Sequence, residues 1–102
     1  MRIIYGKYGY SIYKSTECGI IAHNTGKEFA NGHTHVNNVK TAKYLIDMCH
    51  YKRIPRHLSI YLLVSLLRLS DDGEYQNKIS ALIEEKKQRK QTYYNVNKGC
   101  NK

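Results

Sequence analysis

Two histidines separated by one residue, His33 and His35, are the side chains that most directly suggest chemistry in this chain. In an extended segment they would project from the same side, about 6.5 Å apart along the strand. Imidazoles at that spacing can share or flank a metal ion. No acidic side chain stands near them except Glu28, so we predict no metal or other cofactor and interpret the pair as a strand end whose side chains hydrogen-bond a turn. A metal site at His33 and His35 remains the alternative.

A run of cations lies in His50–His57, around an Ile-Pro pair that predicts a break between two helices. With Pro55 at the first position of the second helix, Arg56 and His57 would fall in its first turn, where positive charge opposes the helix dipole. We therefore predict that these cations and the exposed N–H groups hold an anion such as phosphate. The predicted residues in this run are Lys52, Arg53, Arg56 and His57.

An ion pair would also explain Arg56, and the acids considered for it are Asp47, Asp71 and Asp72. Further cations extend the predicted surface along the flanking helices. These are Lys40, Lys43, Lys86, Lys87, Arg89 and Lys90.

The formal net charge is +9, and the last acidic residue is Glu85. Six cations follow it, with Tyr93 and Tyr94 between them. Lysine and arginine displace counterions from phosphates, and tyrosine rings can stack on bases, so the segment suits a polyanion. It equally suits an exposed helix end, because the dipole favours cations at a helix C-terminus.

The spacing of apolar residues changes along the chain from one typical of strands to one typical of helices, and these elements must position the candidate residues. Residues 3–5 and 8–14 are short runs of β-formers, and 18–23 is predicted as a second strand after a turn at 15–17. Residues 27–36 are predicted as a third strand or an extended loop. Apolar residues then recur at helical spacing in 39–52, 55–69 and 71–91. Asn37 or Asn38 is the expected N-cap of the first of these helices, and Asp71 is the expected N-cap of the third.

The sequence thus predicts an α+β fold, a short N-terminal antiparallel β-meander followed by three packed α-helices. We expect residues 1–91 to form a single domain and 92–102 to form a flexible basic C-terminal tail. Tyr8, Tyr10 and Tyr13 are predicted on the exposed side of the meander, where tyrosines are common anchors of protein interfaces.

Three cysteines without a C-x-x-C pair indicate reduced thiols rather than disulfides or a zinc knuckle. The longest apolar stretch, 58–69, is too short to cross a bilayer, and the first residues do not read as a signal peptide. We therefore expect a cytoplasmic protein without a membrane partner.

The composition, with ten Tyr, one Pro and no Trp, is similar to that of small proteins of phages and mobile elements of low-GC bacteria, which include anti-CRISPR and other anti-defence proteins. The resemblance implies a non-enzymatic inhibitor that binds a host complex or captures a nucleotide. The segment Gly32–His35 resembles the G-H-T-H segment of calcineurin-like metallophosphoesterases, but the other metal-binding segments of that family are missing from this sequence.

We expect a small non-enzymatic binding protein that engages nucleic acid, a ribonucleoprotein or a phosphate-bearing nucleotide through a basic helical surface. One alternative is an inhibitor of a host defence system, anti-CRISPR-like, that acts by protein–protein binding. Another is a His-dependent metal phosphodiesterase or nuclease. The sequence leaves the oligomeric state open.

Overall fold

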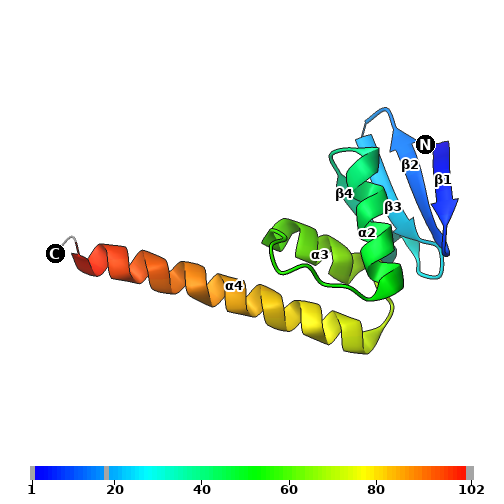
Figure 1. The fold of residues 1–102 in the computed structure, drawn as a ribbon. Helices are drawn as coiled ribbons and strands as arrows, with labels where there is room; N and C mark the ends of the chain where they lie inside the picture. The colour runs from blue at the N-terminus through cyan, green and yellow to red at the C-terminus, as the bar shows by residue number, and fades with distance from the viewer. Residues whose placement is uncertain (1, 18, 101–102) are drawn as a thin grey trace.

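The computed structural model describes residues 2–17 and 19–100, with side chains as far as residue 89. Four strands form one antiparallel sheet in the order β1-β2-β3-β4, and helices follow it, so the predicted α+β fold is confirmed (Figure 1). The strands are β1 (Arg2–Lys7), β2 (Tyr10–Ser15), β3 (Gly19–Asn24) and β4 (His33–Val36). The helices are α1 (Phe29–Gly32), α2 (Val39–Tyr51), α3 (Ile60–Leu69) and α4 (Gly73–Cys100).

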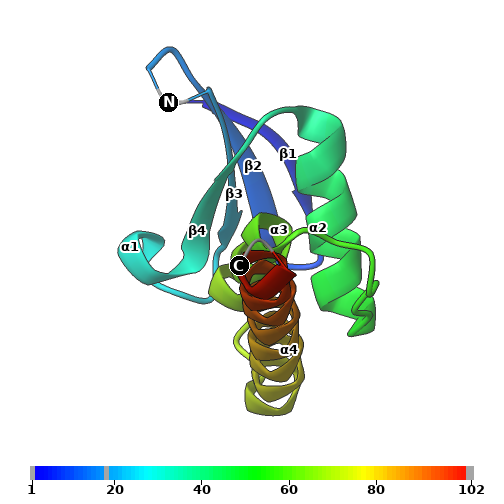
Figure 2. The same ribbon diagram turned by 90° about the vertical axis from the view of Figure 1, so that its left-hand side faces the viewer.

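Strand alternation divides the sheet into two different faces. Ile12, Ala22 and Val36 are buried on the face against which α2 packs. Tyr13, Ile21 and His35 lie opposite one another on adjacent strands. Each is the neighbour along its strand of one of these buried residues and therefore points to the opposite face. Figure 2 shows α2 on one side of the sheet and the short α1 near one end of the other side.

The first long helix, α2, forms as the sequence predicts. The Asn38 side chain accepts a hydrogen bond from the Thr41 backbone N–H, which caps the helix start. Ala42, Ile46 and Cys49 lie on the buried face. Lys52 ends the helix in a left-handed conformation, with φ of 56°. The predicted end near Lys52 is therefore confirmed.

The second predicted helix begins later than expected, and this corrects the dipole argument. α3 starts at Ile60, where the Ser59 side chain accepts from the Leu62 backbone N–H. The Pro55 carbonyl instead closes a turn with the Leu58 N–H, and the buried Leu58 side chain anchors the loop to the core. Serine satisfies an unpaired N–H of the first turn, which proline cannot do. The prediction that residues 56 and 57 lie in the first turn of a helix is therefore wrong.

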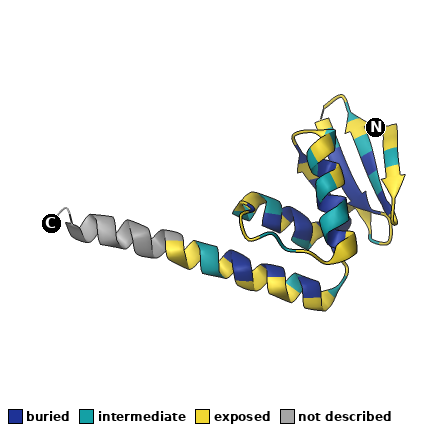
Figure 3. Ribbon diagram, viewed as in Figure 1, coloured by how far each residue is buried: buried dark blue, intermediate teal, exposed yellow. Residues whose placement is uncertain are grey.

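The last helix, α4, packs on α3, and its residues Tyr75, Ile79, Leu82 and Ile83 are buried. Figure 3 shows buried, dark-blue bands along the described part of α4. Its cap is Asp72 rather than the predicted Asp71, because the Asp72 carboxylate accepts the Tyr75 N–H at 2.9 Å. The helix backbone continues to Cys100, beyond the end predicted near residue 91. Because the side chains of residues 90–100 lie outside the described part, the division into a domain and a flexible tail stays a prediction.

The segment 27–36 contains a short helix that the sequence pattern did not indicate. α1 precedes β4, and Gly32 ends it against the Lys27 side chain. A Cβ atom at position 32 would stand 2.6 Å from the Lys27 Cβ, so glycine is required by this close approach rather than by an interrupted strand. In the described residues, no helix is both long and apolar enough to span a membrane.

Candidate nucleic-acid interface

A strained two-residue turn places the first residue of the candidate site. Tyr8 and Gly9 join β1 to β2, with φ of 57° and 83°. Two positive φ values are typical of a type I′ turn, which favours Asn-Gly over a bulky first residue. Tyrosine in this conformation costs on the order of 1 kcal/mol. The turn therefore holds an aromatic ring where the backbone alone would favour asparagine.

The Tyr8 ring lies against the C-terminal end of α2. It stacks on His50 with the ring centres 3.5 Å apart and the planes 2° from parallel. Tyr51 meets both rings edge-on, and its hydroxyl lies 3.1 Å from that of Tyr8. Tyr8 is 39% exposed and Tyr51 is 55% exposed. We call Tyr8, His50 and Tyr51 the aromatic platform.

Cations stand over the platform and beside it. Lys7 Nζ lies 4.8 Å from the Tyr8 ring centre, and Arg53 Cζ lies 5.9 Å from that of Tyr51. Lys43 Nζ, on α2, lies 4.5 Å from the ring centre of Tyr5 on β1. These contacts orient positive charge around exposed rings.

The hydroxyl pair on the platform is polarised. The contact with Tyr51 and then that with Lys7 lower the pKa of Tyr8, because they stabilise its phenolate form. The same contacts raise the pKa of Tyr51 and that of Lys7. In the hydroxyl pair itself, either oxygen can be the donor.

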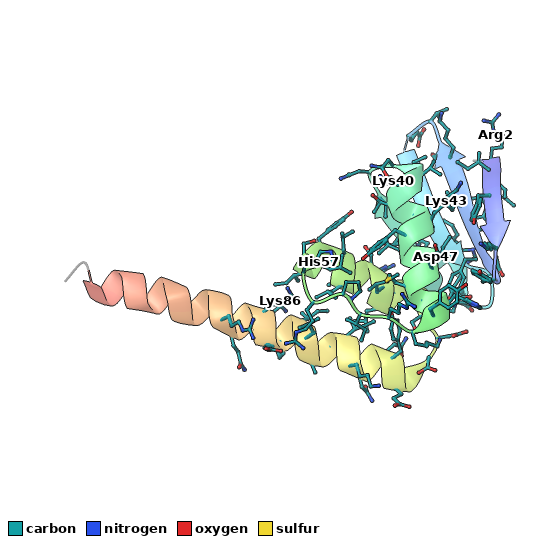
Figure 4. The ribbon with its side chains drawn as sticks, in the orientation of Figure 1. Arg2, Lys40, Lys43, Asp47, His57 and Lys86 are labelled. Atoms are coloured by element: carbon teal, nitrogen blue, oxygen red, sulfur yellow. The ribbon has the colours of Figure 1, made fainter. Side chains whose placement is uncertain are left out.

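One face of α2 extends the platform along β1. Lys40, Lys43, Asp47 and His50 recur at spacings of three or four residues and so share one side of the helix. Figure 4 labels the first three of them along α2. Asp47 is the one acid in the α2 sequence and offsets part of the charge. The resulting surface, from Lys40 to the aromatic platform, carries cations along one edge of the molecule.

A groove of about 370 Å³ opens beside the platform. Its walls come from the Tyr8 turn, the turn after β3 and the end of α2. The lining residues are Tyr8, Gly9, Tyr10, Asn24, Thr25, Gly26, His50, Lys52 and Asp71. Stacked rings therefore stand at the rim of a polar depression large enough for part of a nucleotide.

Several of the predicted cations take part in ion pairs instead of standing free. Lys52 Nζ lies 3.8 Å from Asp72 and also faces the Tyr75 ring. Arg56 lies 3.3 Å from Glu85. The sequence left an ion pair as the alternative explanation of Arg56. The acid that pairs with it is Glu85, and not Asp47, Asp71 or Asp72.

The predicted residues on α4 form a second basic area. Arg89 also pairs with Glu85, Lys86 is half-buried and Lys87 is exposed. His57 is exposed in the loop before α3, while the Lys90 side chain lies outside the described residues. The predicted cations are thus brought together in two groups, one on α2 and one at the α3–α4 side.

The three tyrosines predicted on one exposed side do not share a surface. Tyr10 is only 7% exposed and packs into the core with Ile12. Tyr13 is an odd number of residues further along β2 and so points to the opposite face. Tyr8 lies in the turn rather than in the strand. The joint placement was wrong because Tyr10 and Tyr13 are three residues apart on β2 and so face opposite sides, while the turn at 8 and 9 separates Tyr8 from the strand.

His33 and His35 lie on β4 with their ring centres 5.1 Å apart. Nδ1 of His33 donates to the Phe29 carbonyl, as expected for a strand end next to a turn. Within residues 2–17 and 19–100, no group of three or more His, Cys, Asp or Glu side chains is arranged to hold a metal ion. The fold brings the two histidines together, but among the described residues it places no third His, Cys, Asp or Glu side chain beside them to complete such a group.

Sequence reasoning missed the platform residues His50 and Tyr51 and the flanking cation Lys7. A tyrosine followed by glycine between two strands was the available signal, because it places an aromatic ring at a turn that favours asparagine. Nothing local to the sequence could place that ring against residues 50 and 51. The chain matches no protein-family model, and no curated protein sequence or solved structure shows significant similarity to it.

Proposed function

We propose that this protein binds single-stranded nucleic acid through the aromatic platform and the cations of α2. The observation that supports this most directly is the exposed Tyr8–His50 stack with Lys7 beside it. Bases that are not paired stack on such rings irrespective of sequence, while lysines and arginines follow the phosphates. The two requirements occur side by side on this surface.

The strain at Tyr8 supports the same proposal. A turn that needs positive φ at both positions is most stable with asparagine or glycine first. Tyrosine at this position costs stability and places an exposed ring on His50. Strained residues of this kind cluster at binding sites, where the strained side chain contacts the ligand.

The experiment measures binding of fluorescently labelled oligothymidylate and oligouridylate by anisotropy over a range of salt concentrations. We expect the logarithm of affinity to fall linearly with that of salt, because each contacted phosphate releases about 0.7 of a counterion from a single strand. Lys43→Ala should lower affinity and make the slope shallower by about one contact. Lys78→Ala is the matched control, since its charge pairs with Glu74 on α4.

The decisive variant is Tyr8→Asn. It should leave thermal stability unchanged or higher, because asparagine suits the turn, yet weaken binding roughly 5- to 100-fold through loss of a stacked base. Tyr13→Asn, on the other side of the sheet, controls for loss of any tyrosine. Affinity that is insensitive to salt and to Tyr8→Asn would rule the proposal out.

The second candidate function is protein binding by an inhibitor of a host defence system. The observation that favours it is an apolar cluster on the sheet face opposite α2. Ile3 is 60% exposed and pairs across the strands with Tyr13, whose ring meets that of Phe29 edge-on. A protein complex that survives nuclease treatment and is lost in Ile3→Asp, with Tyr8→Asn unaffected, would favour this function over nucleic-acid binding.

A further inference from the structure

We propose that His33 and His35 form a two-histidine site for a divalent transition metal of borderline softness, namely Cu²⁺, Ni²⁺ or Zn²⁺. The proposal is independent of nucleic-acid binding, because β4 carries the two histidines at the far edge of the sheet from β1. It depends on the geometry of the two rings and on the contacts that hold them.

The ring separation fits one shared ion. Both side chains leave β4 on the same face, and their ring centres lie 5.1 Å apart with planes 79° from parallel. With metal–nitrogen bonds of about 2.0–2.1 Å and a tetrahedral angle, two imidazoles on one ion have ring centres roughly 5 Å apart. The described structure therefore needs little rearrangement to hold a metal between them.

The tautomer of His33 also suits a ligand. Its Nδ1 donates to the Phe29 carbonyl, which leaves the lone pair on Nε2. Phe29 also stacks on the ring, with centres 4.4 Å apart and planes 9° from parallel. Metal-binding histidines commonly donate their second nitrogen to a carbonyl in this way, because the bond fixes the ring and increases its basicity.

The backbone that carries the two rings is held by α3. Arg68 Nε donates to the His33 carbonyl at 2.8 Å, and the Tyr61 hydroxyl donates to the His35 carbonyl at 2.7 Å. Between them, the Thr34 hydroxyl donates to Ser65 Oγ at 2.8 Å. Three successive residues are thus fixed by side chains of one helix, which lowers the ordering cost of binding.

The ligand set selects the class of metal. Two neutral imidazoles suit Cu²⁺, Ni²⁺ and Zn²⁺, whereas Mg²⁺ and Ca²⁺ require oxygen ligands. Two ligands leave coordination positions for water, so we expect weak binding, with Cu²⁺ bound more tightly than Zn²⁺ by the Irving–Williams order.

The test is titration of the full chain with Cu²⁺ at neutral pH, where most imidazoles are unprotonated. Calorimetry should give one ion per chain, and electron paramagnetic resonance should show two coordinating nitrogens. His33→Gln and His35→Gln should each lower the Cu²⁺ affinity at least tenfold, since one ligand is removed. His57→Gln, which changes an exposed histidine in the loop before α3, should leave affinity unchanged.

A second variant separates a ligand role from a structural one. Phe29→Ala keeps the backbone carbonyl that accepts from His33 but removes the stacked ring, so it should retain binding with reduced affinity. Circular dichroism of each variant checks that the fold persists. Equal Cu²⁺ affinity in the wild type, His33→Gln and His35→Gln, or a spectrum with one coordinating nitrogen, would overturn the proposal.

Discussion

At the residue scale, Tyr75 joins parts of the chain that would otherwise separate. Its ring is buried, and its hydroxyl lies 3.2 Å from the Met48 carbonyl and 2.6 Å from the Arg53 carbonyl. The first of these carbonyls is in the last turn of α2, and the second opens the loop toward α3. One side chain of α4 therefore fixes both the helix end and the loop beside the aromatic platform.

Tyr75→Phe should lower the free energy of unfolding by about 1–2 kcal/mol, because the Arg53 carbonyl loses the hydroxyl that donates to it. The Met48 carbonyl still accepts the Arg53 backbone N–H. Urea denaturation followed by circular dichroism measures this. Tyr44→Phe is the matched control, since it removes a tyrosine hydroxyl from a half-buried ring at the edge of the same core. Equal urea midpoints for Tyr75→Phe and the wild type would contradict this role.

At the element scale, a polar stripe of α3, made of Tyr61, Ser65 and Arg68, covers the edge strand β4. The outer edge of β4 would present unpaired carbonyls, and the Tyr61 and Arg68 side chains donate to two of them. Arg68 also donates to the Ala30 carbonyl of α1. An edge covered in this way cannot pair with another chain. The stripe is thus a docking surface between helix and sheet.

A buried amide links the end of β3 to the end of α3, and Lys27 after the turn also donates to the Arg68 and Ser70 carbonyls. Asn24 Nδ2 donates to the Leu69 carbonyl at 2.8 Å, and its Oδ1 accepts the Gly26 N–H at 2.9 Å. Asn24→Ala should destabilise the protein by about 1–3 kcal/mol, because the buried Leu69 carbonyl and the part-buried Gly26 N–H each lose a partner. Asn37→Ala, at an exposed position next to the α2 cap, should stay within about 0.5 kcal/mol.

Thermal unfolding followed by circular dichroism compares these two variants. A shift for Asn24→Ala no larger than that for Asn37→Ala would show that the amide does not link the sheet to α3. The comparison is fair because the same side chain is shortened in each variant.

At the scale of the whole molecule, the core resists ionisation. Burial raises the pKa of the Cys49 thiol to about 12 and also raises the pKa values of Tyr10 and Tyr75. The folded chain therefore keeps protons that the unfolded chain loses above about pH 9 for cysteine and pH 10 for tyrosine. Stability from these groups is fully present below pH 9 and is lost as pH rises toward 12.

We expect the urea midpoint to fall between pH 8 and about pH 10.5, with each such group contributing up to about 1.4 kcal/mol per pH unit. Cys49→Ala should be less stable at neutral pH, because it leaves a cavity, but should show a shallower alkaline decline. A urea midpoint constant across this range would mean that these groups ionise in the folded state.

The sequence by itself determined the features that depend on neighbours along the chain. Alternation in β2, the apolar face of α2 and the cap at Asn38 follow from spacings of two to four residues, and so the α+β fold was predictable. The net charge and the cations of α2 were equally readable. The start of α3 was not, because Pro55 and Ser59 are both acceptable starts, and the burial of Leu58 favours the second.

Only the tertiary structure decided which of these residues meet. Tyr8 stacks on His50, 42 positions along the chain, and Arg56 in the loop before α3 meets Glu85 of α4. No short-range spacing encodes such contacts, because they arise when α2 and α4 pack on surfaces that the whole fold creates. The same packing places α3 behind His33 and His35 and so holds the two rings in register. Helix periods and caps are local physics, whereas both proposed sites depend on the packing of distant segments.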